Sequence, residues 1–307
     1  MKIYKTFQSL EDNSKRYVWQ FEGIPQGIES GVFKGIGKQN RYSLTVSVQN
    51  GCSWHTNNKQ CNYCVTGKQD FWGNLKSEEI VSQITGMLDD NYNDIVNSEL
   101  EIAYMGMGEP ANNYQEVKKA IIESEKIIKE KYKIKVFRHI FATCGVPLII
   151  YRLKEDILSG DYGDAVIKLH LSLHSANSTK RKILMPVDEL FPIDEVIKAS
   201  KDFGKSLKAM VNINYMLFKN YELDPGITVN TIAHEDINEL LDKLDPQIHK
   251  IIFCEFNETF GRNGIVTEEE ATQLKQIATQ KGFQANIFGA FGKSIKLACG
   301  QLSGKLI

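Results

Sequence analysis

Hydrophobic residues along this chain follow two alternating periodicities. Short apolar runs typical of buried strands occupy residues 100–105, 136–143, 165–173, 209–218, 250–256 and 284–289. Between them, apolar residues recur every three or four positions, as in helices, over residues 77–88, 117–128, 148–158, 192–203, 234–244 and 267–280. This alternation, with about six repeats, predicts an α/β fold: a partial parallel barrel with crossover helices.

The first 50 residues have a different pattern. Residues 17–21, 31–34 and 44–48 read as strands, and turn-prone Gly23, Pro25 and Gly27 separate the first two. We therefore expect a small N-terminal β extension over residues 1–45 and a core domain over residues 46–307.

Composition and charge narrow the class of protein. The 307 residues are 42% hydrophobic and 24% charged, ordinary values for a globular protein. The sequence has no apolar run of membrane-spanning length and no signal-peptide pattern near Met1, so we expect a cytoplasmic protein without a membrane partner. A net charge of −1 provides no overall basic field for nucleic acid, although a local patch would be enough.

Three of the six cysteines, Cys52, Cys61 and Cys64, have the spacing C-x8-C-x2-C. Clustered thiols in a reducing compartment indicate a metal or an iron–sulfur cluster rather than disulfides. Adding His55 would complete a tetrahedral zinc site, whereas the cysteines alone would hold a [4Fe–4S] cluster with one iron open. The spacing alone leaves both sites possible.

Polar or reactive residues also follow several predicted strands. In parallel α/β folds, the loops at the carboxyl ends of the strands meet at one rim and carry the chemistry. We therefore predict an active site at this rim. Besides the three clustered cysteines, its candidate residues are Gly108, Glu109, Cys144, Ser172, His174 and Asn257.

Several motifs resemble one family of enzymes. The sequences CNYCVTGK (61–68), MGMGEP (105–110), SLHSAN (172–177), CEFN (254–257) and ACGQLSG (298–304) are similar, in order and spacing, to those of the radical S-adenosylmethionine (SAM) RNA adenine methylases. These are the large-subunit rRNA and tRNA adenine C2 methylases and the related C8 resistance methylases. The resemblance covers residue 16 to the C-terminus and favours the iron–sulfur interpretation of the cysteines.

The resemblance implies a role for each candidate residue. Cys52, Cys61 and Cys64 would hold a [4Fe–4S] cluster that binds SAM, and Gly108 and Glu109 would bind the amino group of SAM. The implied partners are an RNA substrate, rRNA or tRNA, and an electron donor such as flavodoxin or ferredoxin. Contacts to the ribose, carboxylate or adenine of SAM would come from Ser172, His174 and Asn257.

Two further residues resemble catalytic positions of the family. Cys299 matches the cysteine that is methylated by one SAM molecule and then passes its methyl carbon to the adenine. Glu29 resembles a glutamate with a proton-acceptor role. The alternative for Cys299 is a structural role as a buried cysteine. The alternative for Glu29 is a solvated strand residue.

The chain also departs from the family. The family spaces its first two cluster cysteines by three residues, where this chain has eight, and Thr45 stands where the family has a cysteine that resolves the RNA adduct. We hypothesise that Cys144 replaces that cysteine, the alternative being a packed strand-end residue. Cys254 is expected in the core, and we expect the family's N-terminal accessory domain and a basic tail to be missing.

Two alternative functions follow from these departures. One is a radical SAM enzyme of the same scaffold that acts on a small molecule, nucleotide or peptide. The other is a non-catalytic zinc-stabilised RNA-binding protein, with Cys52, His55, Cys61 and Cys64 as ligands. Lysines near residues 126–135 and the run 180–182 provide only weak support for RNA binding, because charge runs are usually solvated faces.

Overall fold

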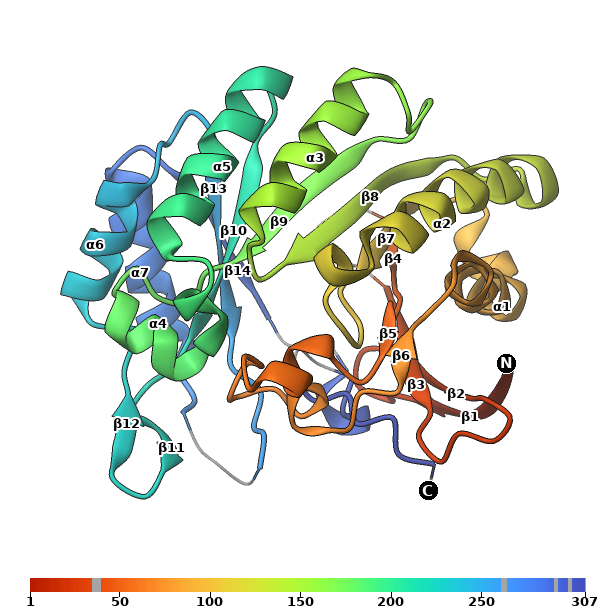
Figure 1. The fold of residues 1–307 in the computed structure, drawn as a ribbon, viewed down its shortest axis with the longest axis horizontal. Coiled ribbons are helices and arrows are strands. Elements are labelled where there is room, and N and C mark those ends of the chain that lie inside the picture. The colour runs from red at the N-terminus through yellow and green to blue at the C-terminus, as the bar shows by residue number, and fades with distance from the viewer. Residues whose placement is uncertain (35–39, 261–263, 290–291, 298–299, 307) are drawn as a thin grey trace.

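A ten-stranded sheet forms the centre of the computed structural model, which describes residues 1–34, 40–260, 264–289, 292–297 and 300–306 (Figure 1). The first strands pair antiparallel, and every neighbouring pair from β4 to β14 is parallel. In spatial order the strands are β1 (Lys2–Gln8), β2 (Lys15–Gln20), β3 (Ile28–Lys34), β4 (Arg41–Thr45), β7 (Glu99–Tyr104), β8 (Val136–Thr143), β9 (Ile167–Ser172), β10 (Val211–Leu217), β13 (His249–Glu255) and β14 (Gln284–Phe288).

Helices cover one face of the parallel strands and form the outer side of the molecule (Figure 1). The strands direct side chains such as Leu169, Leu171 and Ile213 to this face, where they are fully buried. Helix α5 turns Val196 and Phe203 of its apolar stripe toward the same core. The helices are α1 (Ser77–Ile95), α2 (Tyr114–Ile127), α3 (Pro147–Leu158), α4 (Ser178–Leu184), α5 (Ile193–Leu207), α6 (His234–Lys243) and α7 (Glu268–Gln280).

The expected α/β class, with a mostly parallel sheet and antiparallel strands at the N-terminus, is confirmed. Helix α7 begins with a capping box: Thr267 Oγ1 accepts from Glu270 N at 3.2 Å, and Glu270 Oε2 accepts from Thr267 N at 3.0 Å. Helix α1 begins at Ser77, as predicted. Glu79 Oε2 accepts from Lys76 N at 2.8 Å, so a carboxylate rather than the Ser77 hydroxyl satisfies the first free amide.

The N-terminal strands continue the main sheet. Strand β4 pairs antiparallel with β3 on one side and parallel with β7 on the other. The division into residues 1–45 and 46–307 stays a prediction. Two short ribbons complete the structure, β5 (Gln49–Asn50) with β6 (Gly73–Asn74) and β11 (Tyr221–Asp224) with β12 (Ile227–Val229). In the ranges that the structure describes, no helix is long and apolar enough to cross a membrane.

Candidate active site

The loop that carries the three clustered cysteines lies beyond the carboxyl end of β4. The backbone carbonyl of Cys52 accepts from His55 N at 2.9 Å, and that of Cys61 accepts from Cys64 N at 3.2 Å, which gives two tight turns. All three cysteines are half-buried and pack against the hydrophobic core. Burial raises the pKa of Cys61 to about 12, and the nearby Cys64 adds to this shift. The loop therefore brings three partly buried thiols close enough to interact electrostatically.

Among the described residues, the cysteine loop does not form a site for a single metal ion. Across the described ranges, no group of three or more His, Cys, Asp or Glu side chains converges as the ligands of one ion do. His55 instead has its Nδ1 atom 3.1 Å from the carbonyl oxygen of Gly67. A four-iron cubane separates its cysteine ligands more widely than one ion does, so Cys52, Cys61 and Cys64 need not converge on a point.

Gly108 and Glu109 lie at the end of β7, beside the cysteine loop. Gly108 has a φ of +98°, and a Cβ atom there would lie 2.5 Å from the side chain of Gln49, so the position requires glycine. Glu109 is buried, and its two carboxylate oxygens each accept at 2.9 Å, one from Ala111 N and the other from Cys144 N. A carboxylate has about four acceptor sites, so Glu109 retains capacity for a ligand donor.

His174 supports the cysteine loop from the end of β9. Its Nδ1 atom accepts from Met216 N at 3.0 Å, and its ring packs edge-on against Tyr63, with centroids 5.4 Å apart. Burial, with a smaller contribution from Arg181, lowers the pKa of His174 to about 3. His174 is therefore a neutral imidazole that holds the residue next to Cys64.

Among the described residues, two buried amide oxygens, on β10 and just beyond the end of β13, have no hydrogen-bond donor. They belong to Asn257, which was predicted from the sequence, and to Asn214 of β10, which was not. Asn214 pairs in register with Ser172 on β9, so both side chains lie on the same face of the sheet. The alternation of Asn212 and Asn214 with apolar neighbours was the signal that could have identified Asn214. Such oxygens could accept hydrogen bonds from hydroxyl or amino groups of a ligand.

Cys144 lies at the end of β8 between Glu109 and Arg181. It is buried, and burial, with the nearby Glu109 carboxylate, raises the pKa of its thiol well above the usual range. Its carbonyl oxygen accepts from Arg181 Nη2 at 2.8 Å. Thr45 is buried at the end of β4, and its hydroxyl cannot lose a proton at neutral pH or form a disulfide as a thiol can. The surroundings of Cys144 favour the neutral thiol.

Arg181 is structural rather than a phosphate ligand. It is fully buried and forms an ion pair with buried Asp188. Its neighbour Lys180 pairs with Asp236 through bonds of 2.6 and 2.7 Å. The run 180–182 therefore offers RNA less positive charge than its sequence suggests.

Glu29 connects the N-terminal strands to the segment that follows Cys299. Only 1% of Glu29 is exposed, and its Oε1 atom accepts from Gly304 N at 2.9 Å and from Ser303 Oγ at 3.3 Å. Its Oε2 atom lies 3.5 Å from Arg16 Nη1. Burial raises the pKa of Glu29, and Arg16 opposes the shift. Cys299 itself lies outside the described residues.

The same C-terminal segment is bonded to the cysteine loop. Val65 N donates to the carbonyl oxygen of Gly300 at 2.8 Å, and Thr66 Oγ1 donates to that of Leu302 at 2.7 Å. Val65 and Thr66 directly follow Cys64 in the sequence, and Gly300 directly follows Cys299. The two sequence motifs, although more than 200 residues apart, therefore form one connected unit.

No protein-family model matches the chain. Among curated proteins, it is 31% identical over 260 residues to a probable dual-specificity RNA methyltransferase RlmN of Pseudothermotoga lettingae, covering 84% of this chain and 67% of the relative. A protein of the same name from Thermotoga petrophila is 30% identical over 307 residues, covering all of this chain and 80% of the relative.

Solved structures show the same fold. A radical SAM methyltransferase from Sphaerobacter thermophilus superposes with a TM-score of 0.80 at 24% identity, covering 98% of this chain and 80% of the other. Streptococcus suis SuiB bound to its precursor peptide gives a TM-score of 0.52 at 18% identity, covering 80% and 49%. The expected radical SAM fold is therefore confirmed.

Proposed function

The chain belongs to the RlmN-like radical SAM RNA methyltransferase family, and from that premise we propose that it methylates an adenine base of RNA, at C2 or C8, through a methyl group carried on Cys299. One observation carries this proposal. The segment that follows Cys299 is hydrogen-bonded to the residues that follow Cys64. Such bonding is what a reaction needs if a cysteine must meet the cofactor that Cys64 helps to hold.

The family implies SAM and an iron–sulfur cluster as cofactors, and this chain has residues that suit both. Cys52, Cys61 and Cys64 would hold a [4Fe–4S] cluster, which leaves one iron without a protein ligand. Together the cluster and SAM would supply the one-electron chemistry that amino-acid side chains lack.

The remaining rim residues would orient SAM. Glu109 has acceptor capacity for the SAM amino group, since its two backbone hydrogen bonds do not exhaust its lone pairs. Asn214 and Asn257 each offer a buried acceptor without a donor, suited to hydroxyl or amino hydrogens of SAM. Ser172, next to Asn214 in register, would contact the same part of the cofactor. His174 would act indirectly, by fixing Tyr63.

Glu29 has two possible roles in this reaction. The family resemblance suggests that it accepts a proton from the adenine. Its contacts with Gly304, Ser303 and Arg16 favour a positioning role, because Oε1 accepts two hydrogen bonds and Oε2, which has no hydrogen bond, lies 3.5 Å from the Arg16 guanidinium. Cys144 remains our candidate for resolving the RNA adduct, a role that would require its buried thiol to lose a proton.

A small molecule, nucleotide or peptide is the second candidate substrate. Two observations favour it: Thr45 stands where the family has its resolving cysteine, and Lys180 and Arg181 are committed to Asp236 and Asp188. The radical SAM chemistry would be the same in either case, and only the acceptor of the methyl carbon would differ.

Mass spectrometry with labelled SAM tests the proposal. The protein, reconstituted anaerobically with iron and sulfide, would be incubated with deuterium-methyl SAM, a reductant and an unmodified rRNA or tRNA transcript. We expect label on the peptide that contains Cys299 and in a methyladenosine of the RNA digest. A Cys299→Ala variant should lose both labels, while a Cys254→Ala variant serves as the matched control.

Two other results would change the proposal. Label on Cys299 without label in either RNA would favour the small-molecule or peptide substrate. Formation of 5′-deoxyadenosine without any label on Cys299 would contradict the methylcysteine mechanism.

A further inference from the structure

The inner face of the parallel sheet, turned away from the helices, carries polar side chains, several of which are partly exposed to solvent. On β9, Lys168 and Ser172 are half-exposed, whereas Leu169 and Leu171 between them are fully buried. Successive side chains of a strand point to opposite faces, so Lys168 and Ser172 share the inner face. On β14, Asn286 is exposed in the same way. Side chains on this face can therefore meet a ligand.

Basic side chains outnumber acidic ones across this face. At one side of it, Arg41 Nη2 pairs with Glu99 Oε2 at 2.6 Å, and Arg138 Nη2 pairs with Glu101 Oε2 at 2.7 Å. These two pairs use the carboxylates that β7 contributes. The next cation along the sheet, Lys168 on β9, has no carboxylate partner among the described residues.

Lys250 on β13 is the second such cation. The Asn286 amide satisfies both of its neighbours when its nitrogen donates to the carbonyl oxygen of Ala285. In that orientation its oxygen accepts from Lys250 Nζ at 3.1 Å. It has no carboxylate partner within the described ranges. An amide oxygen orients an ammonium group without neutralising it, so Lys250 keeps its full charge for a ligand.

His170 lies in the middle of these cations and does not offset their charge. Burial, followed by the fields of Arg138, Lys250 and Lys168, lowers its pKa to about 3, so it is neutral. Its Nε2 atom lies 2.6 Å from Asn212 Nδ2, which makes it a hydrogen-bond acceptor. Arg138, Lys168 and Lys250, which we call the inner-face cation cluster, therefore surround a neutral polar centre.

The strand register sets the size of this cluster. Asn212 pairs with His170 on one side and with Lys250 on the other, so Lys250 is two strands from His170, about 10 Å. Lys168 precedes Ser172 by four residues on β9, about 13 Å along the strand. Lys168 is thus about 13 Å and Lys250 about 7 Å from the level of Ser172 at the rim, distances that leave room for one nucleotide.

We propose that the inner-face cation cluster binds the phosphodiester backbone of RNA beside the adenine that enters the site. This inference rests on the proposed function and adds the surface that grips the substrate. An enzyme that modifies a base must extrude it from its stack, and charged contacts to the flanking phosphates hold the strand while the base is out. Lys168 and Lys250 supply that charge near the site without involving the outer surface.

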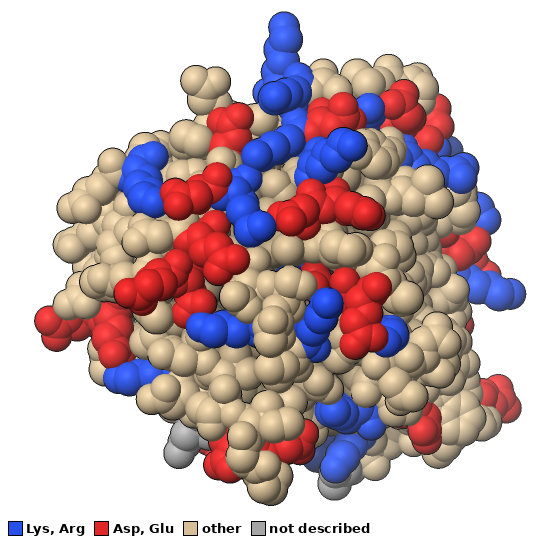
Figure 2. Space-filling model, turned by 60° about the vertical axis from the view of Figure 1, so that its left-hand side comes forward, with Lys and Arg blue, Asp and Glu red and all other residues tan. Residues whose placement is uncertain are grey.

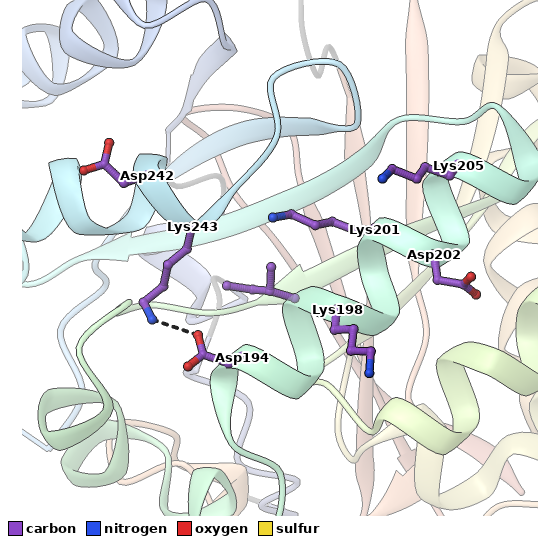
Figure 3. A pocket seen from close by; sticks show the side chains of 8 residues that line it. Asp194, Lys198, Lys201, Asp202, Lys205, Asp242 and Lys243 are labelled. Carbon is purple, nitrogen blue, oxygen red and sulfur yellow. Dashed lines mark hydrogen bonds and ion pairs between the residues drawn. The ribbon is translucent and has the colours of Figure 1, made fainter.

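The outer helical surface provides the contrast and the control. Figure 2 shows acidic and basic side chains interspersed over one side of it, so that side presents no uniform positive field. In the hollow along α5, Lys243 pairs with Asp194 at 2.7 Å, and Asp202 also lines the wall (Figure 3). Lys198 and Lys201 also line that hollow (Figure 3). They carry the same charge as Lys168 and Lys250 but lie outside the inner face, so they serve as the control.

RNA binding by charge variants tests this inference. The reconstituted holoenzyme would be titrated against fluorescent tRNA and large-subunit rRNA transcripts, separately, by fluorescence anisotropy over a range of KCl concentrations. The variants are Lys168→Gln with Lys250→Gln, the charge-retaining Lys168→Arg with Lys250→Arg, and the control Lys198→Gln with Lys201→Gln. Each phosphate contact contributes about 0.7 to 0.9 to the slope of log affinity against log salt.

We expect the inner-face glutamine pair to reduce that slope by about 1.4 to 1.8 and to weaken binding about 25- to 60-fold at 0.1 M salt. The arginine pair should restore wild-type binding, which excludes misfolding as the cause. The control pair should bind as wild type. Wild-type binding by the inner-face glutamine pair, or equal losses in both glutamine pairs, would overturn this inference alone. Failure of the wild-type protein to bind either RNA would contradict the proposal that RNA is the substrate.

Discussion

Replacing Glu29 tests how the C-terminal segment is held. Glu29→Ala would remove the acceptor of the Gly304 N–H bond at 2.9 Å and leave Arg16, only 13% exposed, without its carboxylate. Breaking a buried pair by removing one partner costs about 3 to 5 kcal/mol, and a lost hydrogen bond to a charged group about 1.5 to 3. Because the Arg16 contact is long at 3.5 Å, it should contribute little, and we expect the loss of the acceptor for Gly304 and Ser303 to lower the free energy of unfolding by about 3 kcal/mol.

Glu29→Gln should behave differently. Its amide oxygen can still accept from Gly304, and it removes the cost of burying a charge. Burial raises the pKa of Glu29 above its ordinary value of 4.5. Protonated Glu29 therefore stabilises the folded state at pH values below 4.5, and this stabilisation is lost as the pH rises through the raised pKa. At pH 7 we therefore expect Glu29→Gln to lie within about 1 kcal/mol of the wild type.

Urea unfolding of both variants at pH 7, followed by circular dichroism under anaerobic conditions, measures these differences. The two roles of Glu29 also separate in the methylation assay. If Glu29 positions the segment, Glu29→Ala should slow methyl labelling of Cys299, and Glu29→Gln should not. Equal losses of stability in the two variants would refute the argument that the acceptor matters more than the charge. Normal Cys299 labelling with a trapped RNA adduct in Glu29→Gln would instead support the proton-acceptor role.

Four further substitutions test other parts of the site. Cys61→Ala should lose most of its iron after reconstitution, while Cys254→Ala keeps it, as measured by iron and sulfide analysis. Gly108→Ala should weaken SAM binding at least tenfold by calorimetry, because its φ of +98° is strained for alanine. If Cys144 resolves the adduct, Cys144→Ala should accumulate a covalent RNA–protein species on denaturing gels, and wild-type turnover without it would contradict that role. Arg181→Met should cost about 3 to 5 kcal/mol in urea unfolding, because it leaves a buried carboxylate unpaired.

The sequence predicted the parallel strands and their helices well because one face of each is buried. Strand β13 and helix α5 have strong periodicities, since their apolar residues must meet across the core. Strand β1 was missed for the opposite reason: nearly all its side chains are exposed, so it has no buried face to impose a pattern. Helix α4 was missed because it is short and basic, and Arg181 in it is buried through an ion pair rather than by apolar packing.

The site was predictable where one motif carries the chemistry, and not where distant segments meet. The spacing of Cys61 and Cys64 identified the cysteine loop, but it contained no sign that Val65 would bond to Gly300. Asn214 was missed because a polar residue in a strand means little until its register with Ser172 is known.

The role of Glu29 depends on contacts of the same kind. A lone glutamate in an N-terminal strand suggests a solvated residue, and only the fold brings Gly304 to its carboxylate. In this chain the strands before the parallel sheet, the cysteine loop after β4 and the last residues are hydrogen-bonded to one another. A change at any of the three should therefore affect the segment that follows Cys299. If Cys299 carries the methyl group as proposed, this coupling predicts that its reaction depends on residues that never touch the substrate.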